Sequence, residues 1–129
     1  MKIAVIIIRI LVGLMFLFAS VVVLFNLVPQ PVLEGDVKLF NEGIAAAVYF
    51  VPLLKVIELI CAIAFLSGRF IPLASVVIFP ITVNILLFHA FLTDNVVMAV
   101  VILALNLYLA WSYRDYYKPL FAPKATASL

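Results

Sequence analysis

The sequence predicts an all-α membrane protein: a four-transmembrane-helix antiparallel bundle with a short interfacial helix between helices one and two. The first observation is composition: 69% of the 129 residues are hydrophobic, 11% are charged and the mean hydropathy is +1.39, values outside those of soluble globular domains. The second is four apolar runs, each close to the roughly 20 residues that a helix needs to cross the hydrocarbon core. The third is that the last three runs have connections so short that these helices must be antiparallel neighbours.

The first span is predicted over residues 3–28. Its start, just after Lys2, resembles a secretory signal peptide. The apolar core of a signal is only about 7 to 15 residues long and is followed by a cleavage site of small residues. This run continues well beyond that length without such a site, so we expect it to be retained as a transmembrane helix.

The remaining spans are predicted over residues 45–66, 71–92 and 96–113. Pro72 falls in the first turn of the third span, where its missing N–H costs no helical hydrogen bond. We therefore expect a single integral membrane domain over residues 1–121, followed by a flexible tail over residues 122–129.

The long connection between the first two spans contains its own helical pattern. Apolar residues recur there at helical spacing with charged and polar residues between them: Leu33, Val37, Phe40 and Ile44. The pattern predicts a short interfacial helix over residues 32–43. Such a helix either lies as a lid over the outer mouth of the bundle or anchors the chain at the level of the headgroups.

Charged residues divide between the two ends of the predicted bundle. One end carries most of the basic residues: Lys2, Arg9, Arg69, Arg114, Lys118 and Lys124. The opposite end carries one basic residue with four acidic ones: Lys38, Glu34, Asp36, Glu42 and Asp94. Because Lys and Arg concentrate on the cytoplasmic side, both termini are predicted to be cytoplasmic. The net charge of +2 therefore reports topology and indicates no nucleic-acid partner; the basic end at most holds anionic lipid headgroups.

Cys61 is the single cysteine of the chain. A dithiol redox site, a disulfide within the chain and a thiolate metal cluster each need at least two cysteines. We therefore expect a small core residue in the second span and predict no metal site. A bis-histidine haem is excluded in the same way, because His89 is the single histidine.

Three charged residues lie within the predicted spans: Arg9 in the first, and Lys55 and Glu58 in the second. A charge inside a membrane is costly, and it is a functional hypothesis by default. Counted from the cytoplasmic end at 1.5 Å per residue, Arg9 and Glu58 lie at similar depths, which predicts a buried ion pair between them. In the alternative, Arg9 extends to the cytoplasmic surface and Glu58 is neutral or pairs only with Lys55.

Three polar residues complete the candidate intramembrane polar or proton site: Asn84, His89 and Asn106. His89, near the outer end of the third span, is either a proton carrier or ligand or, as we favour, an imidazole that hydrogen-bonds a neighbouring helix. Asn84 lies on a different face of that span from His89. Asn106, near mid-depth in the fourth span, is predicted to form hydrogen bonds between helices.

Aromatic residues gather at the end of the fourth span: Tyr108, Trp111, Tyr113, Tyr116 and Tyr117. They are typical of the aromatic belt at a membrane interface. A ring-lined pocket among them would also suit the head of a lipid or a quinone.

Five stretches carry a family resemblance: RILVGLMF (9–16), YFVPLLKVIE (49–58), LSGRFIPLA (66–74), NILLFH (84–89) and YRDYYKPLF (113–121). Through them, nearly the whole chain resembles the DoxX-like family of small bacterial four-helix membrane proteins. Many relatives also carry a Gly-x-x-Lys near the end of the first helix, where this chain reads SVVVLFN (20–26). A site that uses that lysine is therefore not expected here.

The resemblance implies a bacterial cytoplasmic-membrane protein related to the membrane subunit of a thiosulfate:quinone oxidoreductase. In a first functional class, the chain is not a self-sufficient enzyme but a subunit of a quinone-linked oxidoreductase assembly, whose partner subunit holds the electron carrier. The bundle then binds a quinone, and four residues handle protons or hydrogen-bond its oxygens: Glu58, Lys55, Arg9 and His89. In a second class, the chain is a small transporter, which with four helices would need a homo-oligomer, or a structural membrane partner without catalysis.

Overall fold

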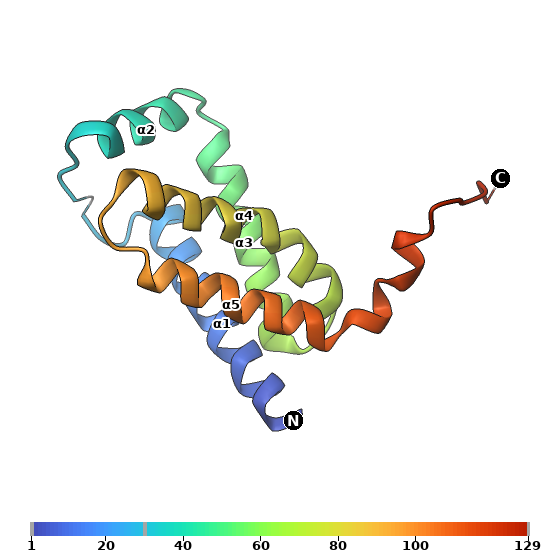
Figure 1. Ribbon diagram of the computed structural model, residues 1–129. Helices are drawn as coiled ribbons and strands as arrows, with labels where there is room; N and C mark the ends of the chain where they lie inside the picture. The colour runs from blue at the N-terminus through green and yellow to red at the C-terminus, as the bar shows by residue number, and fades with distance from the viewer. Residues whose placement is uncertain (1, 30, 129) are drawn as a thin grey trace.

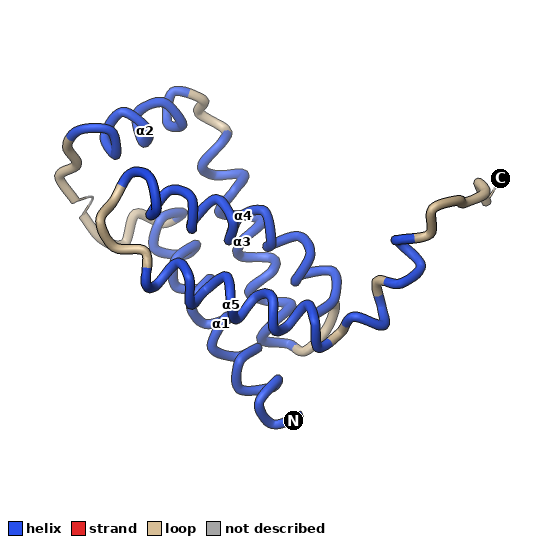
Figure 2. The backbone as a smooth tube through the Cα atoms, viewed as in Figure 1, coloured by secondary structure: helices blue, strands red, loops and turns tan. Residues whose placement is uncertain are grey.

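The computed structural model describes residues 2–29 and 31–128, which contain five α-helices and no strand (Figures 1 and 2). In chain order these are α1 (Lys2–Leu24), α2 (Gly35–Ala46), α3 (Phe50–Ser67), α4 (Ile71–Leu92) and α5 (Val97–Ser112). Two 3₁₀ turns follow, η1 (Arg114–Tyr116) and η2 (Lys118–Phe121). The all-helical class is therefore confirmed for the described residues. The first residue of the predicted domain and the last residue of the predicted tail lie outside them.

Three of the helices, α1, α3 and α4, are long and apolar enough to cross a membrane. Helix α5 is apolar but has 16 residues, which at 1.5 Å per residue span about 24 Å, less than the roughly 30 Å hydrocarbon core. Large apolar side chains cover much of the outer surface of these helices. This surface suits lipid, because lipid tails are as apolar as the side chains that they touch.

Predicted boundaries of three elements are wrong, and all of them lie in the segment around α2. Helix α1 ends at Leu24 rather than at residue 28, because Asn26 takes a left-handed conformation with φ of 51° and turns the chain. Helix α2 ends at Ala46 and α3 begins at Phe50, so the interfacial helix is displaced and the second span starts later than residue 45. The third span begins and ends at residues 71 and 92 as predicted.

The turn between α3 and α4 explains the sharp limits of both helices. Gly68 takes a left-handed conformation with φ of 80°, and its N–H donates to the carbonyl of Ala64 at 3.0 Å. Glycine adopts this conformation without the steric cost that a Cβ brings. Pro72 then lies within the first turn of α4, as predicted.

Helix α1 packs most extensively on α3, and α4 packs most extensively on α5. Gly13 allows the first contact, because a Cβ at this position would lie 2.9 Å from Leu66 Cγ and 3.2 Å from Phe65 Cβ. Small residues permit such close approach between membrane helices. The buried core draws on all four of these helices: Val12, Phe16, Ala62, Phe65, Ile78 and Leu109.

Helix α2 lies at one end of the molecule, which we call the α2 end (Figure 1). None of its residues is buried, and it reaches α4 through Phe40, whose ring centroid lies 5.2 Å from that of Phe88. The start of α1, the α3–α4 turn and η1 lie toward the other end, which we call the terminal end (Figure 1). Both predicted roles of the interfacial helix, lid or anchor, stay predictions.

Candidate functional site

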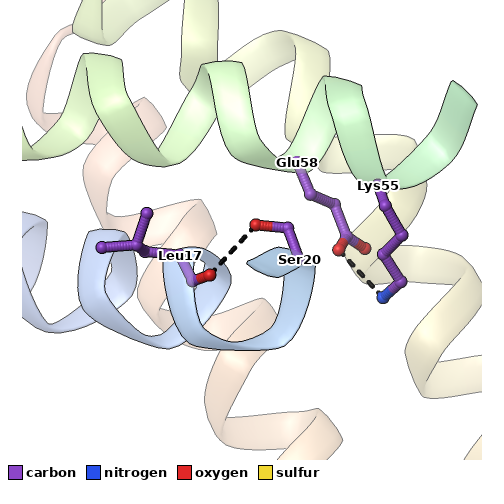
Figure 3. Close-up of polar contacts among 4 residues, drawn as sticks. All are labelled: Leu17, Ser20, Lys55 and Glu58. Carbon is purple, nitrogen blue, oxygen red and sulfur yellow. Dashed lines mark hydrogen bonds and ion pairs between the residues drawn. The ribbon is translucent and has the colours of Figure 1, made fainter. Parts of the chain in front are cut away.

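Lys55 and Glu58 form an ion pair within α3. Lys55 Nζ donates to Glu58 Oε2 at 3.0 Å, and the two side chains are 19% and 3% exposed. Residues three apart on a helix lie side by side, which is what allows this contact. The fully buried Ser20 of α1 lies beside the pair, and its Oγ donates to the carbonyl of Leu17 at 3.1 Å (Figure 3). The carboxylate that the sequence singled out therefore has its partner on its own helix.

Arg9 does not pair with Glu58, so the predicted ion pair between them is wrong. Its guanidinium lies against Gly68, where any side chain would collide with Nη1. Among the described residues Arg9 forms no ion pair, and its Nε is buried without a hydrogen-bond partner. Glu58 lies ten residues before Gly68 along α3, a separation of about 15 Å.

The axial offset between α1 and α3 is the reason for this difference. Arg9 lies at the same height as Gly68, the residue directly after the end of α3. Seven residues of α1 precede Arg9. The start of α1 therefore projects beyond α3 at the terminal end (Figure 1), by about 10 Å at 1.5 Å per residue. Depths counted from helix ends assume that the ends are level, and here they are not.

A buried polar cluster joins α4 to α5. Thr82 Oγ1 lies 2.9 Å from Asn106 Oδ1 and 2.8 Å from the carbonyl oxygen of Phe79, so its single hydroxyl hydrogen serves one acceptor at a time. Asn106 Nδ2 donates to the carbonyl of Ser75 at 3.2 Å. Thr82, Asn106 and Ser75 are fully buried. The predicted role of Asn106 as a hydrogen-bonding residue between helices is confirmed.

His89 and Asn84 stand apart from these groups. His89 Nδ1 lies 2.8 Å from the carbonyl of Ile85, and because a carbonyl only accepts, this nitrogen carries the hydrogen. The bond is therefore made within α4, whereas the sequence predicts one to a neighbouring helix. The ring also packs edge-on against Phe88 at the α2 end. Asn84 is exposed on the outer surface of α4 and has no hydrogen-bond partner among the described residues.

The six candidate residues thus occupy separate places: Arg9 at the α3–α4 turn, Lys55 with Glu58 in α3, Asn106 between α4 and α5, His89 near the α2 end and Asn84 facing outward. Within residues 2–29 and 31–128, no group of three or more His, Cys, Asp or Glu side chains could hold a metal ion. The structure brings together one charged pair rather than a proton site that includes all six residues.

An apolar groove of about 560 Å³ lies between α3 and α4. Ile57, Cys61 and Val77 are among the residues that line it, while Ser67 and Arg69 stand at the terminal end. Neither Arg9, Lys55 nor Glu58 lines this groove. Sequence reasoning missed it because apolar residues that line a groove look like apolar residues that face lipid. The signal that was present is Ser67 and Arg69, two polar residues between two apolar helices.

The chain that follows α5 is held to the start of α4. Tyr117 donates its hydroxyl hydrogen to the carbonyl of Pro72 at 3.1 Å. Burial raises the pKa of Tyr117 above its ordinary value. Nearby, Lys118 Nζ lies 3.0 Å from Asp115 Oδ1, and this hydrogen-bonded charge lowers the pKa of the Asp115 carboxyl.

Comparison with known proteins confirms the family resemblance. The family model for DoxX matches residues 4–90, from α1 through nearly all of α4. No curated protein and no solved structure matches the chain. The matched region contains five of the six candidate residues, and Asn106 lies beyond it. With its apolar helices, the match identifies an integral membrane protein. Because the match covers well over half of its length, the chain belongs to the DoxX family.

Proposed function

We propose that this protein is a membrane subunit that binds a lipid-soluble carrier of the quinone type in the α3–α4 groove and associates with an oxidoreductase. The observation that carries the proposal is the form of that groove, which is apolar along its length with Ser67 and Arg69 at one end. A quinone has the same division, with a polar ring and an apolar tail. Ligand pockets of proteins commonly enclose about 300–1,000 Å³, and this groove falls in that range.

The donors at the end of the groove fit the chemistry of a quinone head. The Arg69 guanidinium supplies N–H donors, and the two ring carbonyls of a quinone accept hydrogen bonds. Ile57 and Val77 supply apolar walls for the tail. In this proposal the associated oxidoreductase holds the electron-carrying group. The chain itself only binds the quinone, through hydrogen bonds and apolar contacts.

The architecture that goes with this function is an antiparallel bundle of four spans in a bacterial cytoplasmic membrane, with both termini cytoplasmic. Gly13 facing Leu66 and Arg9 facing Gly68 support opposite directions for α1 and α3. The bond from Asn106 to α4 supports α5 as a fourth span, because short spans are accommodated by local thinning of the bilayer. The excess of basic residues at the terminal end supports the orientation.

A second copy of the chain is the proposed neighbour of the outer face of α4. Asn84 is exposed there, and polar residues within membrane helices usually face protein rather than lipid. One turn earlier, Pro80 has no N–H, which leaves the carbonyl of Val76 without its usual donor. An amide both donates and accepts, so Asn84 can pair with its own copy across a two-fold axis.

The dimer is tested by the molecular mass of the purified protein in detergent. Wild type should sediment as a dimer, and Asn84→Leu should shift it to a monomer. Ala104→Leu, on the exposed surface of α5, is the control and should leave the dimer intact. A monomeric wild type would contradict this part of the proposal without affecting the groove.

Quinone binding is tested by mass spectrometry of the small molecules that co-purify with the chain from its native membrane. Wild type should carry a quinone, and Ala64→Phe should lose most of it, because Ala64 lines the groove and the added ring fills that space. Ala104→Phe introduces the same ring on the outside of α5 and should keep the quinone. Glu58→Gln should also keep it, since Glu58 does not line the groove. Equal quinone in wild type and Ala64→Phe would refute the site.

The alternative function is that of a structural membrane partner with no ligand of its own. The Lys55–Glu58 pair favours this reading, because the two charges satisfy each other on α3, outside the groove, and so serve no ligand there. Recovery of the wild-type chain with bulk lipid and no quinone would select this function over the first.

A further inference from the structure

A second groove, of about 600 Å³, lies at the terminal end where the start of α1 meets the end of α5. Lys2, Val5 and Ile6 line it from α1, and Trp111 and Arg114 line it from the other side. It therefore has a basic residue on each wall, apolar side chains between them, and no acidic residue in its lining. The quinone proposal does not use this groove.

Arg114 is held in place before any ligand binds. Its Cζ lies 4.3 Å from the centroid of the Trp111 ring, and its Nη1 donates to the carbonyl of Trp111 at 3.0 Å. A guanidinium has five N–H donors in a rigid plane, so this single bond leaves the others available. A planar donor group that is fixed by an aromatic ring suits the oxygens of a phosphate.

Among the described residues, the neighbouring carboxylate of Asp115 forms no ion pair with this arginine. Asp115 is bound by Lys118 at 3.0 Å, and it does not line the groove. Lys2 stands on the opposite wall and is exposed, and its long side chain can move its ammonium toward an anion while its stem covers apolar surface. The groove thus offers two cations to one ligand.

The surroundings of the groove point to a lipid rather than to a soluble anion. The start of α1, the α3–α4 turn and η1, which lie toward the terminal end (Figure 1), carry four basic residues against one acidic residue: Lys2, Arg9, Arg69 and Arg114 against Asp115. Rings of Trp and Tyr mark the level of the headgroups. Below that level the wall is apolar, with Val5 and Ile6 on a helix whose outer surface suits lipid.

We propose that the groove between the start of α1 and the end of α5 is a binding site for an anionic membrane phospholipid. Arg114 and Lys2 hold the phosphate, and Trp111 packs against the region where the headgroup joins the acyl chains. A zwitterionic lipid of the same shape binds more weakly, because its own positive charge lies beside the two cations.

Trp111 is the single tryptophan of the chain, so its fluorescence reports this groove directly. The purified chain is reconstituted in vesicles of phosphatidylcholine that contain either brominated phosphatidylglycerol or brominated phosphatidylcholine at equal mole fraction. Bromine quenches tryptophan only at close range. We expect stronger quenching by the brominated phosphatidylglycerol, and the ratio of the two gives the preference for the anionic lipid.

Arg114→Gln should lower this preference about fivefold, the effect of one basic residue near an anionic membrane. Lys2→Gln should lower it similarly and serves if the first variant does not fold. Lys124→Gln removes the same charge outside the groove and should leave the preference unchanged. Equal quenching by both lipids in wild type, or an equal loss in Lys124→Gln, would overturn the proposal. Loss of the preference on adding inorganic phosphate would show a site for soluble anions instead.

Discussion

Removing one partner of the Lys55–Glu58 ion pair should lower the free energy of unfolding more than removing both charges together. The Nζ–Oε2 distance is 3.0 Å and the carboxylate side chain is 3% exposed. With an effective dielectric constant of about 20, the gross attraction at this distance is roughly 5 kcal/mol. Loss of hydration offsets much of it, so we expect a coupling free energy of about 2 kcal/mol, typical of a hydrogen bond to a charged group.

The assay is a double-mutant cycle on the free energy of unfolding. Lys55→Met, Glu58→Gln and the double variant are unfolded reversibly by transfer from dodecylmaltoside into dodecyl sulfate, and the loss of helix is followed by circular dichroism. Each single variant should destabilise the protein, because it leaves a charged or polar partner unpaired in a nearly dry site. The double variant should be less destabilised than the sum of the two singles.

A second cycle separates this pair from the one that the sequence predicts. Arg9→Gln and Glu58→Gln should be additive within about 0.5 kcal/mol, because sites more than about 10 Å apart with no shared partner behave independently. Additivity of Lys55→Met with Glu58→Gln would refute the ion pair. Coupling of about 2 kcal/mol between Arg9 and Glu58 would instead restore the pairing that the structure excludes.

Three further predictions concern packing, the buried polar cluster and the chain after α5. Gly13→Val should lower the free energy of unfolding by about 1–3 kcal/mol through overpacking, whereas Gly43→Ala, with open space around it in α2, should raise it by about 0.5–1 kcal/mol. Thr82→Val and Asn106→Leu should couple by about 0.6 kcal/mol, the average for hydrogen bonds between membrane helices; simple additivity would contradict the bond. Tyr117→Phe should cost about 0.5–1.5 kcal/mol. Since burial raises the pKa of Tyr117, its stabilising contribution is complete below the ordinary tyrosine value and is lost as pH rises through the raised pKa, which tyrosinate absorbance and unfolding at each pH will test.

The parts of the fold that were predictable have local causes. The start of α4 follows from Gly68 in the turn before it and Pro72 in its first turn, and both act through their own backbone. The junction of α2 and α3 was misplaced because residues 45–49 contain no such signal and are apolar on both sides of the break. The predicted end of α1 is also wrong because no glycine or proline marks it. Asn26 is one of several residues at which the chain could have turned.

The candidate site was predictable as a set of residues but not as an arrangement. Hydropathy located Arg9 and Glu58 inside the spans, because a charge in an apolar run is visible in any sequence. It did not show that one faces Gly68 and the other pairs with Lys55. That arrangement depends on the axial position of α1 relative to α3, and the close contact of Gly13 with Leu66 and Phe65 sets that position.

The sequence by itself determined that this protein is helical and that its surroundings are the lipid of a membrane. So many apolar residues in runs of this length belong in lipid, and in lipid the backbone must satisfy its own hydrogen bonds, which a helix does within each span. Only the tertiary structure decided the partners of the charges and the positions of the two grooves. The physical reason is that lipid and protein core are equally apolar, so hydropathy does not tell which face of a membrane helix turns inward or at what height it meets its neighbour.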